Sequence, residues 1–310
     1  MKRPAWLGGS RPLQWSVVVA APGGAAGEQW GDTWFARDLV AALRRRGQLA
    51  KVVSRGGANS PARDDDDVVL VLRGLRAVSP RPGKGIWLLW VISHPELVEA
   101  DEAARFDAVF AASEHWSRSA ELGARPLLQA TNPERFSPTA AEADSGEDIL
   151  FVGSTRGEFR PVVRDALACG AEVAVYGVGW EQYLEPGQIR GEFVANDGLP
   201  AAYASAGVVL NDHWSDMAAE GFLSNRLFDA AATGARIVSD EAVGLRDVFG
   251  TDIRTYGHQS ELCDLLSGDR GDIFPGRAAR LALAARIAVE HSFDQRAGEL
   301  IAEAQRLLAR

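Results

Sequence analysis

Cysteine is rare in this sequence, and long apolar stretches are absent from it. Only Cys169 and Cys263 occur among 310 residues, which is too few for a disulfide framework or a zinc site. We therefore expect a reducing, cytoplasmic setting. The longest unbroken apolar run covers residues 86–92, whereas a membrane-spanning helix needs roughly 20 residues, so no transmembrane segment is predicted. The basic N-terminus (MKRPAWLGGSRPLQW) has no apolar centre, and we expect a loose tail rather than a signal peptide.

Positive charge is also in short supply. The chain has 33 Lys and Arg against 42 Asp and Glu, a formal net charge of −9. This balance argues against a nucleic-acid partner, because such proteins normally present a basic face. It still allows a local basic pocket for phosphate groups. Hydrophobic residues make up 46% of the chain, as in ordinary globular proteins, so the chain can bury a core.

Short β-branched runs alternate with helical patterns, which predicts parallel sheets wrapped by helices. A chain of 310 residues exceeds the usual size of one hydrophobic core, so two domains are expected. The strands predicted for the first domain cover residues 16–21, 67–72, 87–92 and 108–112, with a helix over residues 33–46. Those predicted for the second cover residues 149–152, 172–176, 207–210 and 236–239, with a helix from about residue 160.

A polar stretch, residues 132–148, separates the two series and is typical of a linker. The predicted fold class is therefore α/β, with two Rossmann-like domains that face each other across a cleft. The first should cover residues 1–138 and the second residues 147–292. Residues 293–310 have the pattern of an amphipathic helix, and we expect this helix to return to the first domain.

The most specific motif is residues 220–240 (EGFLSNRLFDAAATGARIVSD), which predicts a loop, a helix and a buried strand. The N-terminus of a helix presents unpaired N–H groups and a partial positive charge, which suit a diphosphate. Asn225 and Arg226 lie at this N-terminus, and Asp229, one turn further on, can accept hydrogen bonds from a ribose diol. The alternative is an ordinary capped helix whose Arg226 and Asp229 face solvent.

This motif is one of several that resemble the retaining glycosyltransferases of the GT-B fold, in particular the group 1 or spore-maturation-protein-like branch. The resemblance covers most of the chain. It rests on WGDTWFARDLVAALRRRG (30–47), WVISHPELV (90–98), FVGSTRGEFRPVVRDAL (151–167), VYGVGW (175–180), residues 203–240 and HSFDQRA (291–297). It implies transfer of a sugar from a nucleotide-sugar donor to an acceptor hydroxyl, with retention and without a metal or other cofactor.

The resemblance also implies roles for the acidic residues. Asp229 takes the place of the second acidic residue of the family's Glu-x7-Glu motif, which binds the donor ribose. Glu220 lies near the first acidic position, which holds the sugar. The spacing here is nine residues rather than eight, which departs from the motif, so backbone groups of residues 221–224 are the alternative to Glu220.

Basic and glycine residues extend the predicted site. Arg156 and Arg160 lie where the resemblance places a basic pair on the diphosphate, and guanidinium groups can stabilise a leaving group without a metal. A solvated loop and helix start is the alternative for both. Gly177 lets the backbone approach a ligand closely. Trp180 either lines the base pocket or is an aromatic of the core.

Two residues of the first domain join the site. His94 should lie at the carboxyl end of the strand over residues 87–92, where the resemblance places a histidine that contacts the transferred sugar. A histidine that caps the strand is the alternative. Gly31 lies in a loop that the resemblance puts near the donor phosphate, and we predict Asp32 as the N-cap of the following helix. We interpret His213, which also follows a strand, as a structural loop residue.

A metal site is not part of the prediction. Residues 64–67 (DDDD) abut a strand and follow a Gly/Ser/Pro loop, which favours a solvated turn over a divalent-cation site. The predicted catalytic residues are His94 and Glu220, and the predicted donor-binding residues are Gly31, Arg156, Arg160, Gly177, Trp180, Ser224, Asn225, Arg226 and Asp229.

Two other functions stay open. A nicotinamide-dependent oxidoreductase would need G-x-G-x-x-G directly after the first strand, and the loop PGGAAGEQWGD is too long and poorly spaced. A non-catalytic member that binds a nucleotide or a partner protein stays open because of the altered spacing at Glu220. For a transferase, we expect a polysaccharide, a natural product or a carrier-linked molecule as the acceptor.

Overall fold

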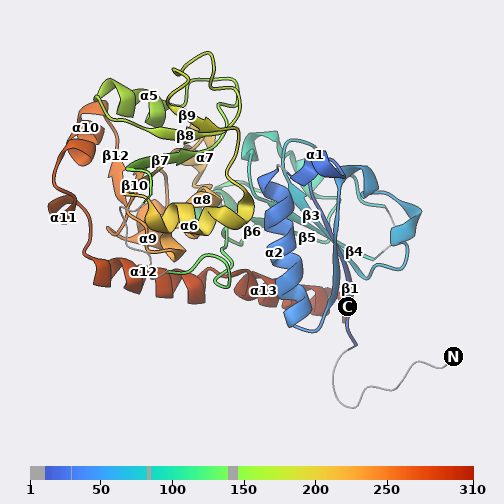
Figure 1. The fold of residues 1–310 in the computed structure, drawn as a ribbon. Coiled ribbons are helices and arrows are strands. Elements are labelled where there is room, and N and C mark those ends of the chain that lie inside the picture. Colours follow the sequence, from blue (N-terminus) through green and yellow to red (C-terminus); the bar gives the residue numbers. More distant parts are fainter. Residues whose placement is uncertain (1–10, 29, 82–84, 139–145) are drawn as a thin grey trace. The chain divides into compact units, whose positions relative to one another are not determined.

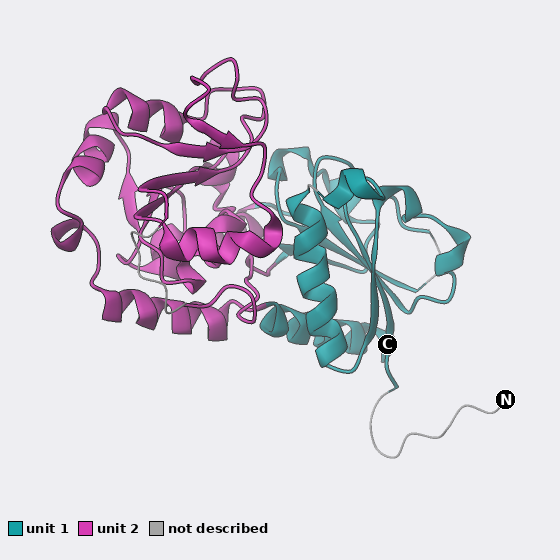
Figure 2. Cartoon of the chain, viewed as in Figure 1, with its two compact units in different colours: residues 1–111, 120–125, 293–310 teal, residues 112–119, 126–292 magenta. Residues whose placement is uncertain are grey.

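A computed structural model gives the structure of residues 11–28, 30–81, 85–138 and 146–310, which fold into two compact units (Figure 2). Unit 1 comprises Met1–Ala111, Ala120–Arg125 and Phe293–Arg310, and unit 2 comprises Ala112–Ser119 and Pro126–Ser292. Most of the expected N-terminal tail and residues 139–145 of the expected linker lie outside the described residues. Each unit is built on a parallel sheet with helices (Figure 1), so the predicted α/β class is correct.

Unit 1 contains a sheet with the strand order β2-β1-β3-β4-β5-β6. Its strands are β1 (Gln14–Val18), β2 (Leu49–Val53), β3 (Val68–Arg73), β4 (Ile86–Val91), β5 (Ala108–Ala111) and β6 (Arg125–Pro126). β4 is buried along its whole length, which explains its unbroken apolar run, since a strand covered on both faces has no polar side. The sequence pattern does not reveal β2, an edge strand whose Leu49 and Lys51 are exposed.

The helices of unit 1 are α1 (Ala25–Glu28), α2 (Gly31–Arg45), α3 (Ala100–Ala103) and α13 (Phe293–Leu308), with 3-10 turns η1 (Arg55–Gly57), η2 (Pro61–Arg63) and η3 (Pro95–Leu97). α2 begins at Gly31 with Trp30 as its N-cap, so the prediction of Asp32 as the N-cap is wrong. Asp32 lies instead in the first turn, where the negative charge of a carboxylate interacts favourably with the helix dipole and stabilises the helix.

The final helix α13 belongs to unit 1 and packs against α2. The ring of Phe293 meets that of Phe35 edge to face, with 4.7 Å between centroids. The Arg45 guanidinium pairs with the Asp294 carboxylate at 2.5 Å. These contacts hold the end of the chain on the first unit.

Unit 2 contains a second parallel sheet, with the order β12-β11-β10-β7-β8-β9. Its strands are β7 (Ile149–Val152), β8 (Ala174–Tyr176), β9 (Ile189–Gly191), β10 (Val208–Asn211), β11 (Ile237–Asp240) and β12 (Arg254–Tyr256). The four predicted strands match β7, β8, β10 and β11 to within two residues at each end. The pattern misses β9 and β12, because an edge strand of three residues is too short to show a period.

The helices of unit 2 are α4 (Glu114–Ser119), α5 (Pro161–Ala168), α6 (Leu199–Ser205), α7 (Ser215–Glu220), α8 (Asn225–Ala232), α9 (Leu245–Phe249), α10 (Gln259–Ser267), α11 (Arg270–Ile273) and α12 (Arg277–Glu290), with the 3-10 turn η4 (Asn196–Gly198). Successive strand residues point to opposite faces, so β7 gives Leu150 to one apolar cluster and Phe151 to the other. α8 and α12 contribute to the Leu150 cluster, and α5 and α10 to the Phe151 cluster. Among the described residues, no helix is long and apolar enough to cross a membrane.

The acidic run over residues 64–67 is not simply a solvated turn. Asp66 is buried, and its carboxylate accepts a hydrogen bond from the Ser16 hydroxyl at 2.6 Å. The same carboxylate forms an ion pair with the Lys51 ammonium group at 3.0 Å. The expectation is therefore wrong for Asp66, which ties the start of β3 to β1 and β2.

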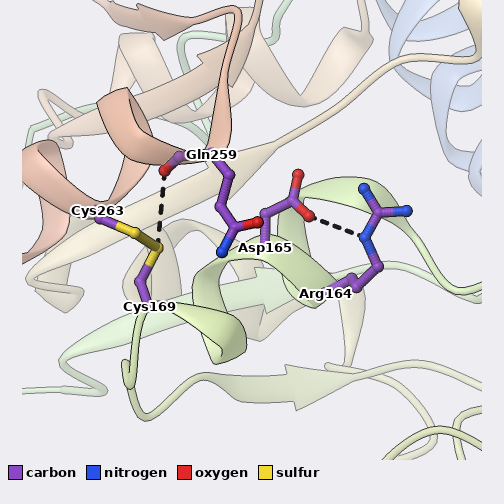
Figure 3. Close-up of a disulfide and its surroundings, with 5 residues drawn as sticks. All are labelled: Arg164, Asp165, Cys169, Gln259 and Cys263. Carbon is purple, nitrogen blue, oxygen red and sulfur yellow. Dashed lines mark hydrogen bonds and ion pairs between the residues drawn. A yellow bond between two sulfur atoms is a disulfide. The ribbon is translucent and has the colours of Figure 1, made fainter.

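A disulfide joins Cys169, which caps the C-terminus of α5, to Cys263 on α10 (Figure 3). The sequence does not predict this bond, because a count of two cysteines says nothing about their distance in space. The two residues are 94 positions apart, so the bond closes a long loop within unit 2.

We expect the disulfide to stabilise unit 2, because it restricts the unfolded chain over the 94 positions between its ends. The double variant Cys169→Ser/Cys263→Ser should lose about 2–4 kcal/mol of unfolding free energy in guanidinium titrations of the oxidised protein. Thiol counting on the unfolded, unreduced wild-type chain should find no free thiol. Two reactive thiols after air oxidation would contradict the bond.

Candidate functional site

Polar side chains collect in unit 2 where β7, β8, β10 and β11 end. Because these strands are parallel, their carboxyl ends share one edge of the sheet, and ligands of α/β sheets bind at such edges. α8 begins at the same edge, since its residue Arg226 reaches the Val152 carbonyl at the end of β7 and Asn211 at the end of β10. The structure thus brings the motif over residues 220–240 to the loop that follows β7.

The first turn of α8 offers two unpaired backbone donors. Ser224, the N-cap, gives its N–H to Nε2 of His213 at 2.9 Å, and the Leu227 N–H donates to the Ser224 carbonyl at 3.0 Å. Between them, the N–H groups of Asn225 and Arg226 have no acceptor in the part of the chain that the structure describes. Free donors at a helix N-terminus make a suitable seat for an anion.

The Arg226 guanidinium is fixed beside these donors. It donates to Oδ1 of Asn211 at 2.8 Å and to the Val152 carbonyl at 2.6 Å, and it lies 5.0 Å from the centroid of the Phe151 ring. Tyr203 interacts electrostatically with Arg226, and burial raises the pKa of the Tyr203 phenol to about 12. Burial lowers the pKa of Arg226 itself. The structure therefore excludes the alternative in which Arg226 faces solvent.

Arg160, the N-cap residue of α5, is engaged by a buried carboxylate. Its guanidinium donates to both oxygens of Asp212, from Nε at 3.1 Å, and to the Ser154 carbonyl at 3.1 Å. The two charged side chains are 2% and 1% exposed. The pair joins the loops after β7 and β10, so the alternative of a solvated Arg160 is wrong.

Arg156 is the most exposed cation at this edge. Its backbone has φ of 59°, which is uncommon for a residue other than glycine, and its guanidinium lies 5.2 Å from the centroid of the Trp214 ring. Desolvation of the guanidinium, and then repulsion from Arg160 and Arg226, lowers the pKa of Arg156 to about 10. It therefore stays charged at neutral pH and available to a ligand.

The three arginines together create local positive charge in a chain whose net charge is −9. Arg160 and Arg226 each disfavour the charged form of Arg156, whereas Asp212 and Glu158 favour it. A bound anion would relieve this repulsion, because an opposite charge a few ångströms away stabilises the cations. The edge of the sheet is thus suited to a diphosphate.

Gly177 and Trp180 support this edge from within unit 2. A Cβ atom on Gly177 would lie 2.1 Å from the Gly153 carbonyl oxygen, so the loops after β7 and β8 can touch only because Gly177 has no side chain. Trp180 is fully buried and donates its indole N–H to the same carbonyl at 2.8 Å. The prediction that Trp180 lines a base pocket is therefore wrong, since its side chain belongs to the core.

Asp229 lies one turn into α8, with both carboxylate oxygens held. Oδ1 accepts from the Thr131 hydroxyl at 2.8 Å, and Oδ2 accepts from the Asn225 amide at 2.9 Å. Oδ1 of Asn225 is buried without a hydrogen-bond partner among the described residues.

Glu220 is the last residue of α7 rather than part of the loop before α8. Its carbonyl accepts from the Ser113 hydroxyl at 2.5 Å, while its carboxylate has no partner among the residues described. Gly221 then ends the helix with φ of 74°, and a Cβ there would lie 3.0 Å from the Val243 carbonyl oxygen. The Glu220 carboxylate is free to bind a ligand.

His94 and Gly31 belong to unit 1. His94 follows β4, at the predicted end of that strand, with φ of 52° and its Nδ1 3.1 Å from Oε1 of Glu96. Gly31 is the exposed first residue of α2. Their roles toward a ligand stay predictions.

Five further residues of unit 2 shape the site without having been predicted in it. Asn211, Asp212 and His213 form a polar triplet at the carboxyl end of β10, after its apolar residues, and that pattern could have identified them. Thr131 and Tyr203 carry no such signal, because they lie far from α8 in the sequence and reach Asp229 and Arg226 only through the fold.

Residues 157–302 match the sequence model of a protein family described as "Glycosyl transferase-like". This region contains Arg160, the strands β10 and β11, and all of α8. No curated protein matches the chain.

Several solved structures share the fold. AviGT4, a glycosyltransferase involved in avilamycin A biosynthesis, matches with a TM-score of 0.67 at 20% identity, over 96% of this chain and 98% of its own. Sucrose-phosphate synthase from Thermosynechococcus elongatus matches with a TM-score of 0.67 at 13% identity, over 96% and 99%. HepE from Anabaena, solved in complex with UDP-glucose, matches with a TM-score of 0.63 at 12% identity, over 93% and 99%.

The family match and the fold shared over nearly the whole chain agree on one class. The chain has the GT-B fold of two Rossmann-like units, and its residues 157–302 match a glycosyltransferase-like family. The fold likeness alone would show the architecture only, and the family match adds the activity class for residues 157–302.

We expect Asp212→Ala to destabilise unit 2 by about 3–5 kcal/mol, because it leaves the buried Arg160 guanidinium without its counter-charge. Urea titrations followed by circular dichroism would measure this loss. The matched control is Glu114→Ala, which breaks the exposed pair with Arg118 and should cost within about 0.5 kcal/mol. Equal losses in the two variants would show that the buried pair is not structurally important.

Proposed function

We propose that the chain transfers a sugar from a nucleotide-sugar donor to an acceptor hydroxyl, with the donor diphosphate at the N-terminus of α8. The observation that carries this proposal is the pair of unpaired N–H groups on Asn225 and Arg226, beside the cations Arg226 and Arg156. The fold shared with HepE, whose structure holds UDP-glucose, supports a nucleotide-sugar donor.

The remaining unit 2 residues bind different parts of the donor. Asp229, held by Thr131 and Asn225, accepts hydrogen bonds from the ribose diol. Arg156 contacts the diphosphate directly, because it is the exposed cation. Arg160 acts through Asp212 and the loop geometry, since its guanidinium is already engaged.

Transfer requires the bond between the anomeric carbon and the diphosphate oxygen to break while the acceptor oxygen bonds to that carbon. The arginines and the α8 N-terminus stabilise the negative charge that develops on the leaving diphosphate, so the reaction proceeds without a metal. We propose retention by attack on the same face, in which a departing diphosphate oxygen takes the proton of the acceptor hydroxyl. The Glu220 carboxylate, which has no partner among the described residues, would orient the sugar.

The acceptor is proposed to be a polysaccharide, a natural product or a carrier-linked molecule. The disulfide between Cys169 and Cys263 does not fit the reducing, cytoplasmic setting that the scarcity of cysteine led us to expect. We also propose that the chain belongs to the spore-maturation-protein-like branch. A panel of acceptors with one radiolabelled donor would test the proposed acceptor class. Unchanged transfer in the presence of EDTA would support the metal-independent path, and its loss would oppose it.

Nucleoside diphosphates should raise the melting temperature of the protein, because a ligand that binds only the folded state stabilises it. Thermal-shift measurements with UDP, GDP, TDP, ADP and NAD would test this expectation. We expect at least one of the diphosphates to stabilise the chain. A response to NAD alone would contradict the transferase proposal and favour an oxidoreductase.

Arg156→Ala should weaken binding of that diphosphate by about tenfold or more, because it removes one charge-assisted hydrogen bond. Isothermal titration calorimetry would measure the dissociation constant. Arg246→Ala, on the exposed first turn of α9, is the matched control for a lost surface cation and should bind as wild type does. Asp229→Ala should also bind more weakly. Unchanged affinity in both Arg156→Ala and Asp229→Ala would remove the proposed pocket.

A further inference from the structure

Two chains of hydrogen bonds leave the first turn of α8 and meet at the carboxylate of Asp240, the last residue of β11. The first begins at Arg226, which donates to Oδ1 of Asn211 at 2.8 Å. The Asn211 amide donates to Oγ of Ser239 at 2.9 Å, and the Ser239 hydroxyl lies 3.0 Å from Oδ1 of Asp240. This chain fixes the side chain of Arg226.

The second chain begins at the backbone of the N-cap residue. The Ser224 N–H donates to Nε2 of His213 at 2.9 Å, and Nδ1 of His213 lies 2.6 Å from Oδ1 of Asp240. The backbone N–H of His213 donates to Oδ2 of Asp240 at 2.8 Å. The His213 side chain is 0% exposed, so water cannot replace these partners.

The chemistry of the partners fixes the protonation state of His213. A backbone N–H can only donate, so Nε2 must offer a lone pair to Ser224. An ionised carboxylate can only accept, so Nδ1 must carry the proton toward Asp240. Both requirements are met by the neutral imidazole that carries its proton on Nδ1. In this tautomer every hydrogen bond of the two chains joins one donor to one acceptor.

We propose that His213, oriented by Asp240, is a positioning residue that aims the unpaired N–H groups of α8 at the donor diphosphate. The interpretation of His213 as a loop residue without a part in the site is thereby replaced. The inference rests on the proposed function, because it assigns the diphosphate to the first turn of α8.

Two substitutions separate this role from plain core packing. His213→Gln keeps an oxygen acceptor near the place of Nε2 and has no titrating ring. His213→Leu keeps a buried apolar volume but leaves the Ser224 N–H without an acceptor. Calorimetry with the nucleoside diphosphate that stabilises the wild-type chain should show about tenfold or weaker binding for His213→Leu. His213→Gln should bind within about threefold of wild type.

Hydrogen exchange at the Ser224 amide tests the same contact without any ligand. The amide should be protected in wild type and His213→Gln and exchange rapidly in His213→Leu, with global unfolding measured in parallel. Equal exchange in all three proteins would overturn the positioning role. If the wild-type chain binds none of the diphosphates although the Ser224 amide follows this pattern, the proposed function fails while the contact stands.

Discussion

A helix of eight residues has little stability of its own in water, so α8 points where its neighbours hold it. Its inner face is buried with Leu227 and Phe228 in the core of unit 2, which sets its position along the sheet. Packing alone leaves the direction of its free N–H groups loosely defined. The hydrogen bonds of Ser224 and Arg226 remove that freedom, and the candidate site depends on them.

The site contains three arginines, and each has a different environment in the fold. Arg160 is buried with Asp212, Arg226 is tied to the ends of two strands, and Arg156 remains exposed above the ring of Trp214. Two of the three therefore shape the edge of the sheet and only one is free to move toward a ligand. Such an arrangement keeps the positive field in place before a ligand arrives, and preorganised charge is what stabilises a leaving group most effectively.

The sequence predicts the parts of this structure that repeat a local pattern. Buried strands such as β4 and β7 are runs of apolar residues, and α13 shows a clear helical period, so each is visible in the sequence. Contacts between distant segments are not visible in this way. Thr131 reaching Asp229, Asn211 reaching Ser239 and the pairing of the two cysteines all depend on the finished fold.

Single residues were also misjudged where burial decides their role. Trp180 follows a glycine turn and could as well have faced a ligand, and only its place against Phe151 shows that it belongs to the core. His213 is the reverse case, a residue that the sequence assigns to a loop and that the structure places in the site. Its role becomes visible only from the contacts of its ring with Ser224 and Asp240.

The disulfide between Cys169 and Cys263 encloses β8, β10, β11 and the whole of α8. A protease that cuts an exposed loop inside this segment, for example beside Phe193, would therefore leave two fragments joined by a covalent bond. Such a nicked chain would travel as one species in non-reducing electrophoresis and separate only when a reductant is added. A single band in non-reducing electrophoresis would thus not guarantee an uncut polypeptide.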